Sequence, residues 1–405
     1  MSTLTLRIPK GSPLTFSELD NNFTNLNTDK VERNGTIPFT ADQSMGGNQL
    51  TNVGQPQAAT DAVPANFLGG FNRNSIINGA FDVWQRGTSF TPSASTATYT
   101  SDRWQTVRGV ANYTAIQIAA SPGESRFGLR IQRTAATSDT NVIILSTVLE
   151  TGDSYKFAGK QITLSFKANV GANYSGASSQ LSCIIRTGTG TDESLNLSGL
   201  FPTGDATPIS TLQTLTTTKT TYSLTGTIAS NASQICAQFR FIPVGTAGAN
   251  DFFDIYDVQL ETGPVATEFE RLPFGITLNQ CLRYFTLLTA VLPNIGQVNC
   301  VLNQTAQWDA PLYYKTPMRV APVFVNNNIT SFNGGPAGAG QAAVFNFATS
   351  AYSVITGAFT FSFFNSTNSG AVLRCAAATS FSGVNGSVGN MQFNSNITTG
   401  LSSEL

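Results

Sequence analysis

Between residues 72 and 260 the chain consists of short segments in which apolar and polar residues alternate, separated by Gly, Ser, Thr and Asn. Alternation with a period of two places each set of side chains on one face of a strand, and many short strands with turn residues between them indicate a β-sandwich. The clearest strands are expected at residues 162–168 and 236–242. Two motifs frame the stretch, at residues 74–85 and 252–261. The sequence therefore predicts one β-sandwich domain whose first and last strands lie far apart in the chain.

The composition limits the classes of partner. The 405 residues carry 22 Lys and Arg side chains against 23 Asp and Glu, which gives a formal net charge of −1. A chain without a basic excess generates no field that holds a nucleic acid. No window approaches the roughly 18 to 20 consecutive apolar residues of a membrane-spanning helix. We therefore expect neither nucleic-acid binding nor membrane insertion.

The residue types also disfavour catalysis and cofactor binding. The chain has no His, which removes the commonest general base and the commonest transition-metal ligand. Glycosidase chemistry needs only two carboxylates, but the acidic residues are scattered, and beyond residue 275 they are Asp309 and Glu404 alone. The five Cys are odd in number and widely spread, as expected of buried thiols and not of disulfides or a zinc site. The sequence predicts a protein that is not an enzyme and has no cofactor.

The clearest helix is expected over residues 13–27. Thr15 is followed three residues later by Glu18, the spacing of a capping box, and Leu14 before the cap can pack on Leu19 as a hydrophobic staple. Apolar residues recur at spacings of three and four along this segment, at Phe16, Leu19, Phe23 and Leu26. Two heptads make no stable isolated helix in water. We expect this apolar face to pack on its own domain, to self-associate or to dock on a larger particle.

Residues 39–63 are short polar and apolar pieces interrupted by Gly46-Gly47 and by Gly54-Gln55-Pro56. They predict brief strands and turns with too little apolar surface to close a core within one chain. Three copies of the strip can bury that surface together, as stacked repeats do with their neighbours. A hinge is expected after this strip, at residues 67–71. The resemblance given below implies that the strip itself is an intertwined shaft shared by three chains.

The last third of the chain predicts a second β-domain. Phe345 and Phe347 alternate with polar residues, as do Phe359, Phe361 and Phe363, and Gly-Gly or Asn-Gly turns lie between such segments. Residues 278–286 are consistent either with a short helix that points Cys281 and Phe285 inward or with a strand.

Several motifs resemble those of known families. The motifs Asn-Gly-Ala-Phe-Asp, within residues 74–85, and Tyr-Asp-Val-Gln-Leu, within residues 252–261, resemble the two ends of jelly-roll carbohydrate-binding modules. Residues 13–23, Pro-Leu-Thr-Phe-Ser-Glu-Leu-Asp-Asn-Asn-Phe, are similar to the N-terminal ends of phage virion proteins. Residues 45–63, from Met-Gly-Gly to Asp-Ala-Val, resemble a repeat of phage tail fibres, in which three chains share a slender shaft.

Further motifs resemble the same phage proteins. The most specific match is Val-Gln-Leu-Glu-Thr-Gly-Pro-Val-Ala-Thr-Glu-Phe-Glu at residues 258–270, followed by Cys-Leu-Arg-Tyr at residues 281–284. Trp-Gln-Arg-Gly at residues 84–87 and Tyr-Thr-Ser-Asp-Arg-Trp at residues 99–104 are similar to segments of phage fibre and tail proteins, and the Met-Arg-Val-Ala-Pro turn at residues 318–322 is similar to one in their terminal domains.

The resemblance implies a homotrimeric tail fibre, made in the host bacterial cytoplasm and carried on the virion. Its parts are expected in this order: an attachment segment with the helix (1–38), a shaft and hinge (39–71), a jelly-roll β-sandwich (72–272) and a C-terminal β-sandwich tip (273–405). The N-terminus implies partners among phage tail or baseplate proteins, and the tip implies a host surface glycan or outer-membrane component.

Two candidate sites lie in the sandwich. Trp84 and Trp104 can stack on sugar rings while Arg86, Asp102 and Arg103 supply hydrogen bonds. The alternative is that both indoles belong to the core of the module. The resemblance also implies a structural calcium, for which Asp82 and either Asp254 or Asp257 are the candidate ligands.

A second interpretation of the whole chain is a structural decoration or adaptor protein of the phage head or baseplate. In that case the jelly roll is a spacer and binds no receptor of its own.

Overall fold

A computed structural model describes residues 9, 11–29, 46, 73–93, 96–108, 112–121, 124–287, 297–304, 307–325, 331–332, 341–346, 351–352, 359–364, 366–377, 388–393 and 400–404. The chain divides into two units, Met1–Leu68 and Gly69–Leu405, which are described separately.

The first unit contains helix α2 (Phe16–Asp29). The predicted capping box is confirmed, because Glu18 N donates to Thr15 Oγ1 at 3.2 Å and Thr15 N donates to Glu18 Oε2 at 2.7 Å. Reciprocal bonds of this kind satisfy backbone donors that the first turn leaves without a partner. The expected shaft over residues 39–71 lies outside the described residues, apart from Gly46.

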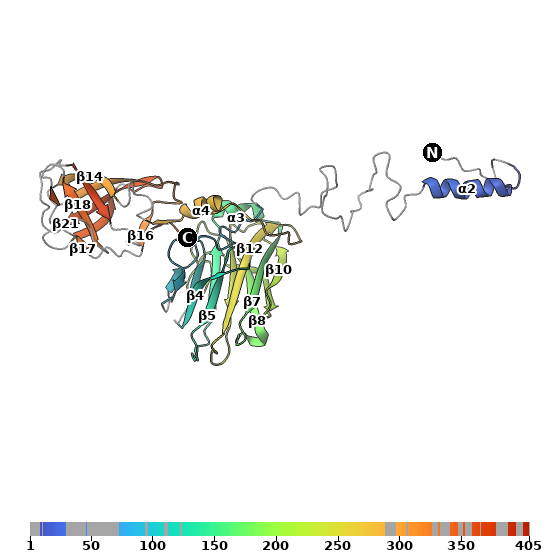
Figure 1. Ribbon diagram of the computed structural model, residues 1–405, viewed down its shortest axis with the longest axis horizontal. Coiled ribbons are helices and arrows are strands. Elements are labelled where there is room, and N and C mark those ends of the chain that lie inside the picture. The colour runs from blue at the N-terminus through green and yellow to red at the C-terminus, as the bar shows by residue number, and fades with distance from the viewer. Residues whose placement is uncertain are drawn as a thin grey trace. The chain divides into compact units, whose positions relative to one another are not determined.

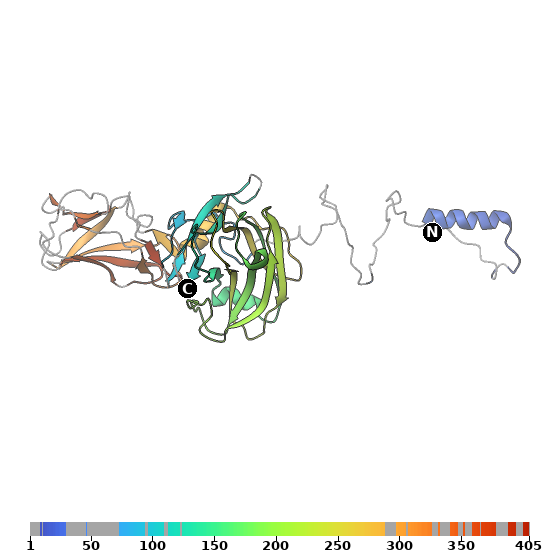
Figure 2. The ribbon, with the colours of Figure 1, turned by 90° about the horizontal axis from the view of Figure 1, so that it is seen from below.

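In the second unit two antiparallel six-stranded sheets form the predicted β-sandwich (Figure 1). The order of the first sheet is β1 (Ser89–Phe90), β4 (Tyr113–Ala119), β5 (Phe127–Arg133), β12 (Phe252–Thr262), β7 (Gln161–Val170) and β10 (Thr220–Thr227). The order of the second is β2 (Thr96–Tyr99), β3 (Gln105–Arg108), β6 (Ile143–Val148), β11 (Gln234–Phe241), β8 (Gln180–Gly188) and β9 (Ala206–Thr214). The strands expected at residues 162–168 and 236–242 are β7 and β11. Figure 2 shows from below how these strands, coloured cyan to yellow, curve around a common interior.

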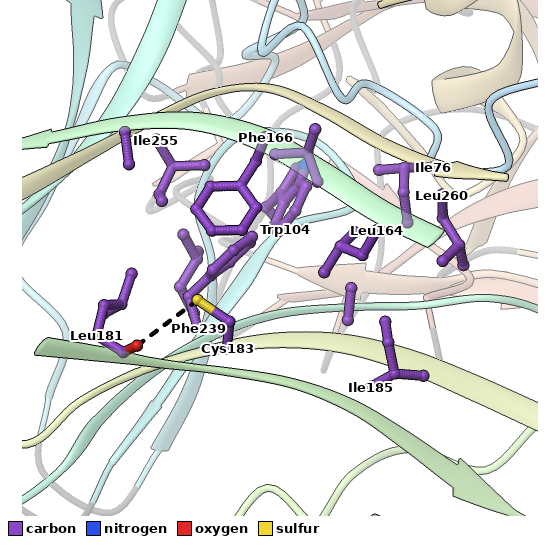
Figure 3. Packing of buried hydrophobic residues seen from close by; sticks show 14 of the residues in the cluster. Ile76, Trp104, Leu164, Phe166, Leu181, Cys183, Ile185, Phe239, Ile255 and Leu260 are labelled. Atoms are coloured by element: carbon purple, nitrogen blue, oxygen red, sulfur yellow. Dashed lines mark hydrogen bonds between the residues drawn. The ribbon is translucent and has the colours of Figure 1, made fainter. Parts of the chain in front are cut away.

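The core of the sandwich lies between the inner faces of the two sheets. Trp104 packs against Phe81 and Phe239, with ring centroids 5.0 and 6.2 Å apart, and Phe166 meets Phe239 edge to face at 4.8 Å. Figure 3 shows the rings of Trp104, Phe166 and Phe239 with nearby aliphatic and thiol side chains, namely Leu181, Cys183 and Ile185 of β8 and Leu164 of β7. All of these side chains are buried, and aromatic packing of this density dominates the stability of a core.

The opening motif, residues 74–85, is a turn segment and not the first strand of the sandwich. It nevertheless lies against the closing strand β12: Ser75 N donates to Leu260 O at 3.0 Å, and Val258 N donates to Gly79 O at 2.9 Å. The side chain of Asn74 donates to Val258 O and accepts from Leu260 N. A Cβ at Gly79 would lie 2.1 Å from Val258 O, which explains the Asn-Gly step in the motif.

The outer face of the second sheet is covered by the connection between β8 and β9. Leu195 and Phe201 of this connection form a buried apolar cluster with Val148 of β6 and Cys236 of β11. Gln238 Nε2 of β11 also donates to Gly199 O at 2.5 Å. This part of the sheet face therefore offers no open surface to a ligand.

After the sandwich the chain forms a helix and two further sheets. Helix α4 (Phe274–Leu282) is followed by a three-stranded sheet of β13 (Phe285–Leu287), β23 (Gly400–Ser402) and β16 (Val323–Val325), in that order. An eight-stranded sheet contains β17 (Ser331–Phe332), β18 (Gln341–Asn346), β22 (Val388–Phe393), β14 (Gln297–Gln304), β15 (Gln307–Tyr313), β21 (Gly370–Ala377) and β20 (Phe359–Phe364), with β19 (Ala351–Tyr352) paired to β18. Short helices α3 (Thr151–Ser154), η1 (Tyr155–Phe157) and η2 (Ala177–Ser179) complete the described elements.

The predicted mainly β fold with one short N-terminal helix is confirmed. Both alternatives for residues 278–286 are partly right, because α4 ends at Leu282 and β13 begins at Phe285. Cys281 and Phe285 are buried as expected, and all five Cys are buried free thiols. The alternating Phe359, Phe361 and Phe363 lie in β20, whereas Phe347 lies outside the described residues. The bounds of the four expected domains remain predictions.

Candidate functional site

Helix α2 presents an apolar face that the described part of the chain leaves open to solvent. Phe16 is 89% exposed, Phe23 63% and Leu19 41%. Leu26 lies on the same helix, and its side chain is outside the described residues. Isolated exposed apolar side chains are common on protein surfaces, but three at helical spacing form a stripe that needs a partner.

The four residues predicted to bind glycan meet in the interior of the second unit. Trp104 is fully buried, and its Nε1 donates to Asn78 O at 3.1 Å. Trp84 is partly buried, donates from Nε1 to Phe81 O and stacks on Phe90. Arg86 and Asp102 have almost no exposed side-chain surface. This burial favours the alternative that the indoles belong to the core, because Trp104, Arg86 and Asp102 offer almost no surface to a sugar ring and Trp84 offers only part of its ring.

The same motifs instead bind the C-terminal end of the chain. Glu404 lies between two arginines, accepting from Arg86 Nη2 at 3.0 Å through Oε1 and from Arg103 Nη1 through Oε2. The three side chains are each exposed by 5% or less. A buried carboxylate shared by two guanidiniums is tolerated only because each charge is matched. We call these three residues the Glu404 junction.

Two aromatic rings complete the junction, one from Phe285 at the start of β13 and one from Tyr284 directly before it. The Arg86 guanidinium lies 3.7 Å from the centroid of the Phe285 ring, and that of Arg103 lies 3.7 Å from the ring of Tyr284. Cations over desolvated aromatic faces are attracted by the ring quadrupole. Gln85 Nε2 donates to Phe285 O at 2.9 Å. The Trp-Gln-Arg, Asp-Arg-Trp and Cys-Leu-Arg-Tyr-Phe motifs thus form one structural joint between the sandwich and the chain that follows it.

Asp102 lies at the edge of this joint. It accepts from Gln85 Nε2 at 2.5 Å and from Gln85 N at 3.2 Å, and Arg86 Nη1 lies 3.4 Å away. Burial raises the pKa of Asp102 to about 6, although Arg86 and the Gln85 bonds oppose that shift. Since a carboxyl with a raised pKa binds its proton more tightly in the folded protein, folding is favoured by a fall in pH across this range.

We expect the Asp102→Asn variant to lose this pH dependence. Between the unfolded-state value near 3.8 and the folded value of about 6, the wild type should gain stability relative to the variant as the pH falls, and lose it as the pH rises. Urea unfolding of both proteins at pH 7, 6 and 5 measures the difference, which is expected to approach about 1.4 kcal/mol per pH unit at most. A difference that stays constant with pH would contradict the burial of an ionisable Asp102.

Two of the calcium ligands expected from the resemblance already pair with cations of the protein. Asp254 pairs with Arg130 in two bonds of 2.7 and 2.9 Å. Asp257 accepts from Ser125 Oγ and lies 2.8 Å from Lys167 Nζ. Calcium takes six to eight oxygen ligands, and no group of three or more acidic, Cys or His side chains able to hold a metal occurs among the described residues. Protein cations already neutralise these carboxylates, so the residues do not fit a calcium ion.

A polar cavity of about 270 Å³ lies beside Asp82. Its walls come from the opening motif, from residues 124–126 before β5 and from residues 269–272 after β12. From the sequence, Asp82 is expected only as a metal ligand, and neither Arg126 nor Arg271 is expected to line a site. Arg271 follows the tail-fibre-like motif directly, whereas Arg126 carries no signal in the sequence.

Comparisons with known proteins give only distant similarities to solved structures. No family model matches the chain, and no curated protein matches it. A CBM4 structure is 18% identical with a TM-score of 0.29, covering 46% of this chain and 98% of its own. The CBM22-1 xylan-binding domain of Paenibacillus barcinonensis Xyn10C is 11% identical with a TM-score of 0.27, covering 43% of this chain and 99% of its own.

A third solved structure comes from a phage. The enzymatically active domain of bacteriophage CBA120 tailspike protein 4 is 12% identical with a TM-score of 0.27, and the match spans 50% of this chain but 22% of the tailspike chain. At these identities and TM-scores none of the three assigns a function to this protein. Among the described residues no helix has the length and apolar character needed to cross a membrane.

Proposed function

We propose that this protein is a non-enzymatic phage tail fibre that is attached to the virion through α2 and binds a glycan on the host cell surface. The observation that carries the proposal is the open apolar face of α2, next to segments that resemble virion attachment ends and fibre repeats. The sandwich beyond it buries its own apolar residues and is compact as a unit. Virion localisation and a homotrimeric assembly are parts of the same proposal. Three copies would let weak glycan sites gain avidity.

The competing interpretation, a decoration or adaptor protein of the head or baseplate, shares the attachment step and differs in the distal partner. Fluorescently labelled full-length protein and residues 69–405 can be incubated with bacterial strains and with phage particles. Binding of residues 69–405 to intact cells supports the tail fibre. Binding of the full-length protein to virion components alone, with no binding to cells of a strain that the phage infects, supports the adaptor.

Replacing Phe16 and Phe23 by Ser should abolish attachment to the virion or to other copies of the chain. The reason is that the two rings supply most of the exposed apolar surface of α2, and burial contributes about 25 cal/mol per Å². The matched control is Tyr155→Ser, which removes an equally exposed ring from η1. Native mass and co-sedimentation with phage particles measure the effect. If the double variant assembles and sediments like the wild type, α2 is not the attachment element.

A further inference from the structure

The cavity beside Asp82 is built from three chain segments that fixed hydrogen bonds hold together. Glu270 Oε2 accepts from Asn74 N at 2.8 Å, which ties the segment after β12 to the opening motif. The motif in turn is bonded to β12 through Asn74 and Gly79. The position of the walls therefore does not depend on a ligand, as in most small-molecule sites.

Asp82 lines this cavity, and one oxygen of its carboxylate lacks a hydrogen-bond partner among the described residues. This atom, Oδ1, is buried. Burial raises the pKa of Asp82, while Arg271 and Arg126 oppose the rise. A buried carboxylate oxygen without a donor is costly. Because Asp82 is only half-buried and lines the cavity, a ligand hydroxyl there would donate to its carboxylate.

Most of the other polar groups around the cavity already have partners. Ser125 Oγ donates to Asp257, Glu124 Oε2 accepts from Lys219, and the amide of Asn74 bonds to β12. The guanidinium of Arg126 lies 4.8 Å from the Phe127 ring centroid and is exposed. Asp82 and Arg126 thus offer an acceptor and a donor from two different segments of the wall, and Phe269 adds an apolar side chain.

We infer that this cavity binds one neutral sugar unit of a surface glycan. One hydroxyl donates to the carboxylate of Asp82, a neighbouring hydroxyl oxygen accepts from Arg126, and the C–H face of the ring lies toward Phe269. Charges of both signs on the wall favour a neutral polyol over an anion or a cation. A volume of about 270 Å³ lies below the range of about 300 to 1,000 Å³ for drug-sized ligands, so it fits a single ring. The inference rests on the proposed glycan-binding function and names its site.

The test uses saturation-transfer NMR of the full-length protein with methyl glycosides of glucose, galactose, mannose and N-acetylglucosamine. We expect one or more of them to bind the wild type. Asp82→Asn and Arg126→Met should each weaken that binding at least tenfold, since each removes the charge from one partner of a hydrogen bond to the sugar. Arg240→Met, which removes an arginine of β11 outside the cavity, is the matched control and should bind like the wild type.

The outcomes distinguish a failure of the proposed binding site from a failure of the proposed glycan-binding function. Equal binding by all four proteins overturns the site. Binding of no glycoside, by protein that still adheres to host cells, overturns the site and leaves the proposed function standing. Binding of no glycoside and no adherence to cells contradicts both. Thermal melting of each variant establishes that it is folded; Asp82→Asn removes a buried charge and Arg126 is exposed, so neither change is expected to unfold the protein.

Discussion

Glu404→Gln should be among the most damaging single substitutions in the chain, although it changes the penultimate residue. Without the carboxylate, the buried guanidiniums of Arg86 and Arg103 lose their shared counter-charge. Removing one partner of a buried ion pair costs about 3 to 5 kcal/mol because the remaining charge stays desolvated. Urea unfolding followed by tryptophan fluorescence measures the loss. The exposed Glu268→Gln is the matched control and is expected to change nothing measurable.

The end of the chain stabilises the fold in a second way, because it supplies a strand as well as the carboxylate. Deleting residues 400–405 removes β23, the central strand of the three-stranded sheet, as well as the carboxylate. We therefore expect the deletion to destabilise the protein more than Glu404→Gln does. If Glu404→Gln unfolds at the same urea concentration as the wild type, the junction is not buried and the motifs at residues 84–87 and 99–104 need another explanation.

Trp104→Ala should destabilise the sandwich by about 3 to 5 kcal/mol, the usual cost of removing a large buried aromatic side chain. The indole fills the space between Phe81 and Phe239 and satisfies Asn78 O. Trp104→Phe keeps most of the volume and should lose less, and Trp84→Ala, at a partly exposed position, should also lose less. Equilibrium unfolding in urea gives all three values.

The Trp104 series also distinguishes a core residue from a binding platform. A core residue changes the free energy of unfolding, whereas a ligand-stacking residue changes affinity and leaves stability nearly intact. A Trp104→Ala protein with the stability of the wild type would restore Trp104 as a candidate sugar platform.

The features that the sequence predicted correctly depend on local patterns. The capping box of α2 involves residues three apart, and β7 and β11 follow directly from alternation with a period of two. Their positions agree with the structure within two residues at each end. Such patterns need no knowledge of what the segment packs against.

The features that the sequence missed depend on distant contacts. Arg86 and Glu404 are 318 residues apart, and nothing near the end of the chain marks Glu404 as buried. Regular alternation would place Asp254 and Asp257, three residues apart on β12, on opposite faces of the strand. The register shift between Tyr256 and Gln259, with Asp257 at a φ of +48°, instead leaves both on the face away from the core, because Ile255 before it and Val258 after it are both core residues. A bulge of this kind reverses the faces of the residues that follow it, and period-two analysis cannot detect it.

The cavity was missed for a related reason. Its acceptor comes from the opening motif, and its donors come from residues about 45 and 190 positions further along the chain. From the sequence, Asp82 is expected beside other carboxylates in a calcium site. In the structure Arg126 and Arg271 line the same cavity as Asp82, which changes the class of ligand that the position suits.

The measurement that tests the central claim most directly is the native mass of the protein in solution. Light scattering should give about three times the chain mass of 42.9 kDa for the full-length protein. The fragment of residues 69–405 lacks α2 and the expected shaft, and a lower mass for it would place the assembly contacts in the first unit. A full-length protein that is monomeric would contradict the shared shaft and leave the decoration or adaptor protein as the better account.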